Sequence, residues 1–223
     1  MTLPTPTTTR RRTAPSSERR RQLIEAATEV IAETGLSGIK TSDVARRAGL
    51  SVGLINHYFS SKDNLLAETL RHLGDELRAR WVRIQQDDTL DTAEKLAAIV
   101  DGMFHPSVAT PTKIAVWFAF FGDAGYRELY RDMAGDFDTE RSAAIEALCH
   151  TLKTEGGYAG INAEALATTI EALADGLWLS TMLYPDWLLP REARRRVFEL
   201  LATQFPRHFT GDGLSAGGTE PRS

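Results

Sequence analysis

The stretch of residues 41–59 constrains the fold of this chain most strongly. It contains two short segments with apolar residues at helical spacing, and Gly49 lies between them. A glycine there can adopt the left-handed conformation that ends one helix before the next begins. Thr41 or Ser42 is expected to cap the first helix, and Ser51 the second. Two short helices with such a turn are typical of a helix-turn-helix, whose second helix can enter the major groove of DNA.

The second of these helices carries small and polar residues where a DNA surface would lie. Val52 and Gly53 open it, so that its backbone can approach DNA closely. Ser51, Asn56 and His57 offer short polar groups to base edges or phosphates. The alternative is an ordinary helical hairpin whose polar residues are solvated. The complete set of predicted DNA-facing residues is Thr41, Ser42, Ser51, Val52, Gly53, Asn56, His57, Tyr58, Lys62, Arg19 and Arg20.

A basic segment precedes this motif. Residues 17–33 have apolar residues at helical spacing, with Gly35 as the expected stop. The arginines at 19–21 open this helix although the helix dipole disfavours cations there, which predicts that at least one contacts a phosphate. Residues 1–16 are rich in Thr, Pro, Ser and Arg and are predicted to form a disordered basic arm. Its arginines at 10–12 either reach DNA or are merely solvated.

The charge distribution supports a DNA-facing end. Residues 1–62 hold ten Lys/Arg and five Asp/Glu, a net charge of +5, whereas the remainder holds sixteen and twenty-five, a net charge of −9. A basic end on an acidic body is suited to a protein that presents one side to phosphates.

The sequence offers no catalytic, cofactor or metal-binding motif, so an enzyme is not expected. The single cysteine, Cys149, excludes an intrachain disulfide, and its neighbour His150 would point about 100° away from it on a helix. No apolar run has the length of a membrane span and no signal-peptide core follows the N-terminus. These features predict a cytoplasmic protein with no membrane partner.

The rest of the chain has the pattern of further helices separated by Pro and Gly breakers. They cover about residues 62–81, 92–104, 110–122, 127–155, 162–184 and 191–205. The predicted fold is therefore all-α. It comprises a three-helix helix-turn-helix DNA-binding domain (17–62), a larger helical effector-binding and dimerisation domain (63–207) and a disordered tail (208–223).

Aromatic residues concentrate in the larger domain. Trp117 and Phe121 share one helix face, and Asp175 and Trp178 share another. Asp175 lies in an otherwise apolar run, so its carboxylate needs a cation, hydrogen bonds or solvent. Aromatic faces with one carboxylate are what a quaternary ammonium ligand requires. The predicted effector-binding residues are Met103, Trp117, Phe121, Asp175, Trp178 and Trp187. The alternatives are an ordinary aromatic core, with Asp175 either exposed or paired with an arginine across a subunit interface.

One recognition helix reads too few base pairs for useful specificity, which predicts a two-fold dimer on a palindromic site. The last two helices carry apolar stripes that could pair into a four-helix bundle with a second subunit. The predicted interface residues are Leu166, Ile170, Leu173, Leu177, Val197, Leu200 and Leu201. The alternative is that both stripes pack only within the subunit.

Three groups of residues together resemble the DNA-binding domain of the TetR family of transcriptional repressors: Arg46–Ser51, His57–Phe59 and Lys62–Leu66. The resemblance implies that the Tyr-Phe pair closes the recognition helix and that Lys62 lies near a phosphate. It also implies dimerisation through the last two helices.

Two further stretches, Trp117–Phe121 and Ala174–Leu179, look like the choline-responsive BetI branch of that family, which represses genes that convert choline to glycine betaine. The resemblance covers roughly residues 17–205, and the loop at 185–190 does not map onto it. A regulator that senses another ligand, a DNA-binding protein without an effector, and a helical enzyme or carrier remain alternatives.

Overall fold

The structure, a computed structural model, describes residues 15–216. The predicted basic arm therefore lies almost entirely outside the described residues, as does the end of the predicted tail. The elements in chain order are α1 Ser16–Gly38, α2 Thr41–Ala48, α3 Val52–Tyr58, α4 Lys62–Gln85, α5 Thr92–Met103, α6 Pro111–Gly122, α7 Arg127–Gly156, α8 Ala163–Leu183, α9 Pro190–Gln204, β1 Phe209–Thr210 and β2 Gly213–Leu214.

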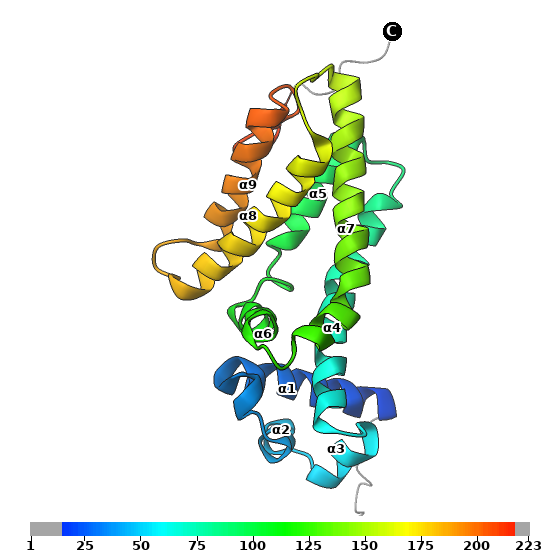
Figure 1. Ribbon diagram of the computed structural model, residues 1–223, viewed down its shortest axis with the longest axis vertical. Helices are drawn as coiled ribbons and strands as arrows, with labels where there is room; N and C mark the ends of the chain where they lie inside the picture. The colour runs from blue at the N-terminus through cyan, green and yellow to red at the C-terminus, as the bar shows by residue number, and fades with distance from the viewer. Residues whose placement is uncertain (1–14, 217–223) are drawn as a thin grey trace, which may run out of the picture.

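Figure 1 shows two groups of helices joined by α4. The helices α1, α2 and α3 lie at one end, and α4 begins beside them and continues into the larger group. In that group α7 packs against α4, α5 and α8, while α8 and α9 lie side by side along one flank. The helix α6 packs on α1, and so connects the two groups a second time.

The helix-turn-helix forms for the reasons that its sequence suggests, with one difference. Gly49 adopts a left-handed conformation (φ 64°) and ends α2, and Gly35 (φ 68°) interrupts α1 where a stop is expected. The capping prediction is wrong in detail. Lys40, not Thr41 or Ser42, occupies the N-cap of α2. Ser51 occupies the N-cap of α3 as predicted, but neither Lys40 nor Ser51 makes a side-chain capping bond. The Ser51 hydroxyl is thus not used to cap α3.

The core of the larger group corrects the predicted dimer interface. Ile170, Val197 and Leu201 are completely buried within the subunit, and Leu166 is 6% exposed. A buried side chain cannot reach a partner, so these four residues pack inside the subunit, as the alternative interpretation had it. Three predicted interface residues are half-buried at the edge of this core: Leu173, Leu177 and Leu200.

The predicted tail begins too early. Residues 209–214 form a two-stranded antiparallel hairpin, so the chain is not purely helical. Phe209 is 2% exposed, and the centroid of its ring lies 6.2 Å from that of Phe198 on α9. The sequence pattern missed this hairpin because two-residue strands are too short to show alternation.

Candidate DNA-binding surface and effector cavity

The start of α3 presents a small, polar surface. Ser51, Val52, Gly53, Asn56 and His57 are all exposed, whereas Ile55 of the same helix is buried in the core. A side-chain carbon placed on Gly53 would meet only the Ser51 hydroxyl, at 3.8 Å. The backbone there is therefore open to close approach by a flat partner. Tyr58, at the end of α3, is half-buried with its ring 5.0 Å from His57.

The predicted basic contacts have partners within the chain. Arg20 on α1 forms a 2.6 Å ion pair with Glu68 on α4 and lies 5.5 Å above the Phe59 ring. Burial opposes ionisation of Glu68, but the hydrogen bonds from Arg20 and Arg71 hold its carboxyl pKa below the ordinary value. Arg20 therefore fixes α1 against α4, which the phosphate prediction did not anticipate.

Two more of the predicted contacts also have intramolecular hydrogen bonds. Arg19 donates to Gln22 (2.9 Å), and Gln22 in turn donates to the carbonyl of Ala48 (2.7 Å). Lys62 Nζ lies 3.4 Å from the carbonyl of Leu36, beyond the Gly35 interruption of α1. An exposed lysine that the sequence prediction omitted, Lys40, directly precedes α2. Lys40 could have been included in the predicted DNA-facing set, because it lies next to Thr41, a member of that set.

The larger group of helices contains a cavity that opens to solvent, with about 480 Å³ of empty space when the solvent at its mouth is included. Five of the six predicted effector-binding residues line it, from helices that are distant in the sequence. The lining residues are Leu77, Met103, Trp117, Phe121, Tyr130, Phe137, Asp138, Arg141, Glu171, Ala174, Asp175 and Trp178. Trp187 is the exception and corrects the prediction: it is 75% exposed, in the loop between α8 and α9.

Aromatic rings form much of the cavity wall. The Trp117 ring stacks on Phe137 with centroids 6.5 Å apart, and Phe121 meets Tyr130 edge-on at 4.8 Å. Trp178 donates its indole N–H to the carbonyl of Met103 at 3.1 Å, which fixes its ring plane. Such rings offer the negative faces to which cations are attracted.

The charged side of the cavity is dominated by carboxylates. Arg141 pairs with Glu171 (2.8 Å) and Asp138 (3.3 Å), and the Tyr130 hydroxyl donates to Asp138 (2.8 Å). The same wall carries Asp175, which makes no ion pair or hydrogen bond with the described side chains. With three carboxylates and one guanidinium, the ionised cavity carries a net charge of −2.

Asp175 is exposed as a residue, as one of the alternatives from the sequence had it, although it lines the cavity. Burial raises the pKa of this carboxyl, and the negative charges of Asp138 and Glu171 raise it further, against the attraction of Arg141. The arginine expected near Asp175 is thus present, but it lies within the subunit and is engaged by other carboxylates. The sequence pattern missed Asp138 and Arg141, whose i,i+3 spacing is also that of ordinary surface ion pairs. It also missed Glu171, which lies 30 residues from Arg141 in the sequence.

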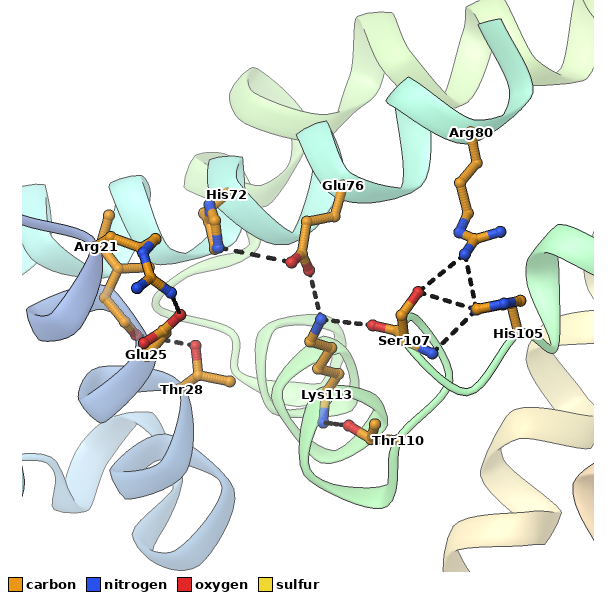
Figure 2. Close-up of polar contacts among 11 residues, drawn as sticks. Arg21, Glu25, Thr28, His72, Glu76, Arg80, His105, Ser107, Thr110 and Lys113 are labelled. Carbon is orange, nitrogen blue, oxygen red and sulfur yellow. Dashed lines mark hydrogen bonds and ion pairs between the residues drawn. The ribbon is translucent and has the colours of Figure 1, made fainter. Parts of the chain in front are cut away.

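A polar cluster ties the cavity-lining helices together outside the cavity (Figure 2). Lys113 of α6 bonds to Glu76 of α4 (2.5 Å) and to the carbonyl of Ser107 (2.6 Å). Arg80 of α4 donates to His105 and Ser107 in the loop before α6. The helix that carries Trp117 and Phe121 into the cavity is therefore held to α4 at its other end.

The same helix reaches the DNA-binding group. Ser37, near the end of α1, donates to Asp123, directly after α6, at 3.3 Å. Tyr126, directly before α7, donates to Asp63 in the first turn of α4, also at 3.3 Å. A displacement of α6 by a ligand therefore has a short route to α1 and to the start of α4.

Three negative findings apply to residues 15–216. No helix in that range is long and apolar enough to cross a membrane. Among the described His, Cys, Asp and Glu side chains, which leave out that of residue 136, there is no cluster of three potential metal ligands. Cys149 is completely buried, and burial raises the pKa of its thiol to about 12, which keeps it protonated and unreactive.

A helix-turn-helix surface joined to a helical group with an aromatic cavity defines a DNA-binding regulator, and comparison with known proteins agrees. Residues 23–69 match the model for bacterial regulatory proteins of the tetR family, and residues 92–206 match that for the C-terminal part of BetI-type transcriptional repressors. The HTH-type transcriptional regulator BetI of Stenotrophomonas maltophilia is 33% identical over 179 residues, which are 79% of this chain and 88% of that protein.

Solved structures give the same result. A transcriptional regulator from Pseudomonas aeruginosa PAO1 superposes with a TM-score of 0.73 at 27% identity, over 85% of this chain and 91% of that one. A regulator from Saccharomonospora viridis, solved in complex with choline, has a TM-score of 0.65 at 25% identity, over 83% and 96% of the two chains. The chain belongs to the TetR family and is a BetI-type transcriptional regulator. It is not an enzyme, and the resemblance stated from its sequence is confirmed.

Proposed function

We propose that this regulator is a repressor that binds a palindromic operator as a homodimer and is released by a quaternary ammonium compound such as choline or betaine aldehyde. The observation that carries the proposal is the cavity, whose aromatic walls and unpaired carboxylate are attached through α6 to the DNA-binding group. Because such a protein acts on chromosomal DNA, we expect it in the cytoplasm.

The choice of ligand follows from the chemistry of the cavity. A quaternary ammonium has no hydrogen-bond donors, so it gains most from aromatic faces and a nearby negative charge. Trp117, Phe121 and Trp178 supply the faces, and Asp175 supplies a carboxylate without a partner among the described residues. The choline complex of the Saccharomonospora viridis regulator supports the same class of ligand.

The release mechanism uses the contacts of α6. A ligand seated against Trp117 and Phe121 biases the position of this helix, which packs on α1 and hydrogen-bonds to it through Asp123. The expected result is a change in the spacing of the two recognition helices, so that only one half-site fits at a time. A coupling free energy of about 1–3 kcal/mol between the two sites is sufficient for a clear response.

Binding of the ligand can be tested without DNA. Choline or betaine aldehyde should raise the melting temperature of the purified protein, because a ligand that binds only the folded state stabilises it. A protein that bound the operator but showed no shift with either compound would be a regulator of another ligand or one without an effector.

We propose that the dimer forms on the exposed face of α8. Small side chains follow one another along it, so a second helix could approach closely. They are Ala165, Thr169, Ala172 and Gly176. Half-buried Leu173 and Leu177 flank this face, and Leu200 lies on the neighbouring α9. Exposed apolar residues of the following loop, Trp187 among them, would be covered by the same partner.

Arginine in place of Ala172 should dissociate the dimer at micromolar concentration, because a large charged side chain cannot be accommodated between closely packed helices. Light scattering after size-exclusion chromatography would report the mass. The matched control is Ala147→Arg, at an exposed position of α7. Equal masses for Ala172→Arg and the unmodified protein would exclude this face.

A further inference from the structure

A buried tryptophan beside the effector cavity lacks a hydrogen-bond partner. Trp81 on α4 is 6% exposed, and its Nε1 atom is buried with no acceptor among the described residues. By contrast, Trp178, which lines the effector cavity, donates its indole N–H to the carbonyl of Met103. Leaving an N–H group buried and unpaired costs about 1–3 kcal/mol, so such groups in native proteins call for an explanation.

Trp81 lines a small cavity between α4, α5 and α7. This cavity has room for roughly one water-sized group and is lined mainly by apolar side chains, with Arg80 and Arg141 as its charged members. Leu77, Met103 and Arg141 line both this cavity and the effector cavity. The two spaces are therefore neighbours that share a wall of three side chains.

We propose that the small cavity is the second part of the effector site, and that the effector carries an oxygen acceptor to which Trp81 donates its indole N–H. The inference rests on the proposed cation site and extends it: the positive group lies among the aromatic rings with Asp175, and the oxygen lies a few bonds away toward α4.

The polarity of the two cavities supports this orientation of the ligand, with its cation in the effector cavity and its oxygen toward Trp81. The effector cavity is rich in carboxylates and favours a cation, whereas the unpartnered group beside the small cavity, the Trp81 N–H, is a donor only. The two arginines of the small cavity already have partners: Arg80 bonds to His105 and Ser107, and Arg141 to Asp138 and Glu171. A ligand group that only donates would leave the Trp81 N–H unsatisfied. The ligand class is therefore a quaternary ammonium with a hydroxyl, carbonyl or carboxylate oxygen, rather than a simple tetraalkylammonium.

Two compounds of nearly equal size separate the contribution of the ligand's oxygen to the affinity from that of its cation. Choline and ethyltrimethylammonium carry the same cation, and only choline has the oxygen. Calorimetric titration of the full-length protein should show choline binding about tenfold more tightly, the equivalent of one hydrogen bond of about 1.4 kcal/mol. Betaine aldehyde, whose carbonyl oxygen can only accept a hydrogen bond, should also bind more tightly than ethyltrimethylammonium.

The Trp81→Phe variant removes the N–H and keeps an aromatic ring. We expect it to reduce the preference for choline to about twofold or less while changing the affinity for ethyltrimethylammonium little. The matched control is Trp178→Phe, which removes an N–H already bonded to Met103 and should weaken both compounds alike.

A measurement on the unmodified protein covers the case in which Trp81→Phe does not fold. The indole ¹H–¹⁵N resonance of Trp81 should move downfield with choline and not with ethyltrimethylammonium. An equal affinity of the unmodified protein for the two compounds, or an indole resonance with the same shift in both complexes, as a resident water would give, overturns this inference alone. Binding of neither compound overturns the cation site, and this inference with it.

Discussion

Glutamate in place of Gly53 should weaken operator binding about 1000-fold, or about 4 kcal/mol, because it sets a carboxylate against the DNA phosphates. Gly53 is exposed, and a side chain there meets only the Ser51 hydroxyl at 3.8 Å, so the substitution fits the fold. An acidic residue in the first turn of a helix is also compatible with its dipole. In a dimer the repulsion occurs twice, which is why the expected loss is large.

The matched control is Thr151→Glu, which adds the same charge at an exposed position near the end of α7, far from α3 in Figure 1. Affinities would be compared by fluorescence anisotropy at one salt concentration, since phosphate contacts make DNA binding salt-dependent. If Gly53→Glu bound the operator as well as Thr151→Glu does, α3 would not be the recognition helix.

The second large effect is expected at Asp175. Replacement by Asn should weaken binding of the quaternary ammonium effector about 100-fold. This loss lies in the lower half of the 2–5 kcal/mol expected for losing one partner of a buried charge pair, because Asp175 is exposed before the ligand binds. The shape of the side chain is retained, so that packing against the aromatic walls should not change. Operator affinity without effector should stay the same.

The same variant should alter stability in a pH-dependent way. Because burial and neighbouring carboxylates raise the pKa of Asp175, the folded protein holds this proton to a higher pH than the unfolded chain. Ionised Asp175 therefore destabilises the fold as pH rises above the ordinary carboxyl range, and Asn removes that cost. In thermal melting experiments, the melting temperature of Asp175→Asn should rise relative to that of the unmodified protein as the pH increases from acidic to neutral.

Asp88→Asn, in the exposed segment between α4 and α5, is the matched control for both measurements. It removes the same charge outside the cavity and should change neither ligand affinity nor the pH profile. Unchanged ligand affinity in Asp175→Asn would remove this carboxylate from the cation site, whatever the stability result.

The local features of the fold were predictable because they depend on local chemistry. Gly49 ends α2 in the conformation that its sequence position suggests, and the aromatic pair Trp117 and Phe121 reaches one cavity because helical spacing places both on one face. The charged wall was not predictable, since Arg141 and Glu171 come together only through the packing of α7 on α8.

The sequence also could not predict which side chains are buried within the subunit. An apolar stripe such as Ile170 or Val197 indicates that a helix packs against something, but not whether the neighbour belongs to the same subunit. Trp187 illustrates the opposite error: its aromatic character suggested a ligand wall, yet its loop places it on the surface of the subunit, away from the cavity. The donor of Trp81 without an acceptor could be found only once its surroundings were known.

Whether the cavity controls DNA binding can be measured by fluorescence anisotropy of labelled DNA from upstream of the protein's own gene, at fixed salt, with and without choline and betaine aldehyde. We expect tight binding that either compound releases at concentrations that fill the cavity. Binding that stays equally tight when calorimetry shows the cavity to be occupied would contradict the coupling of the cavity to the DNA-binding surface through α6.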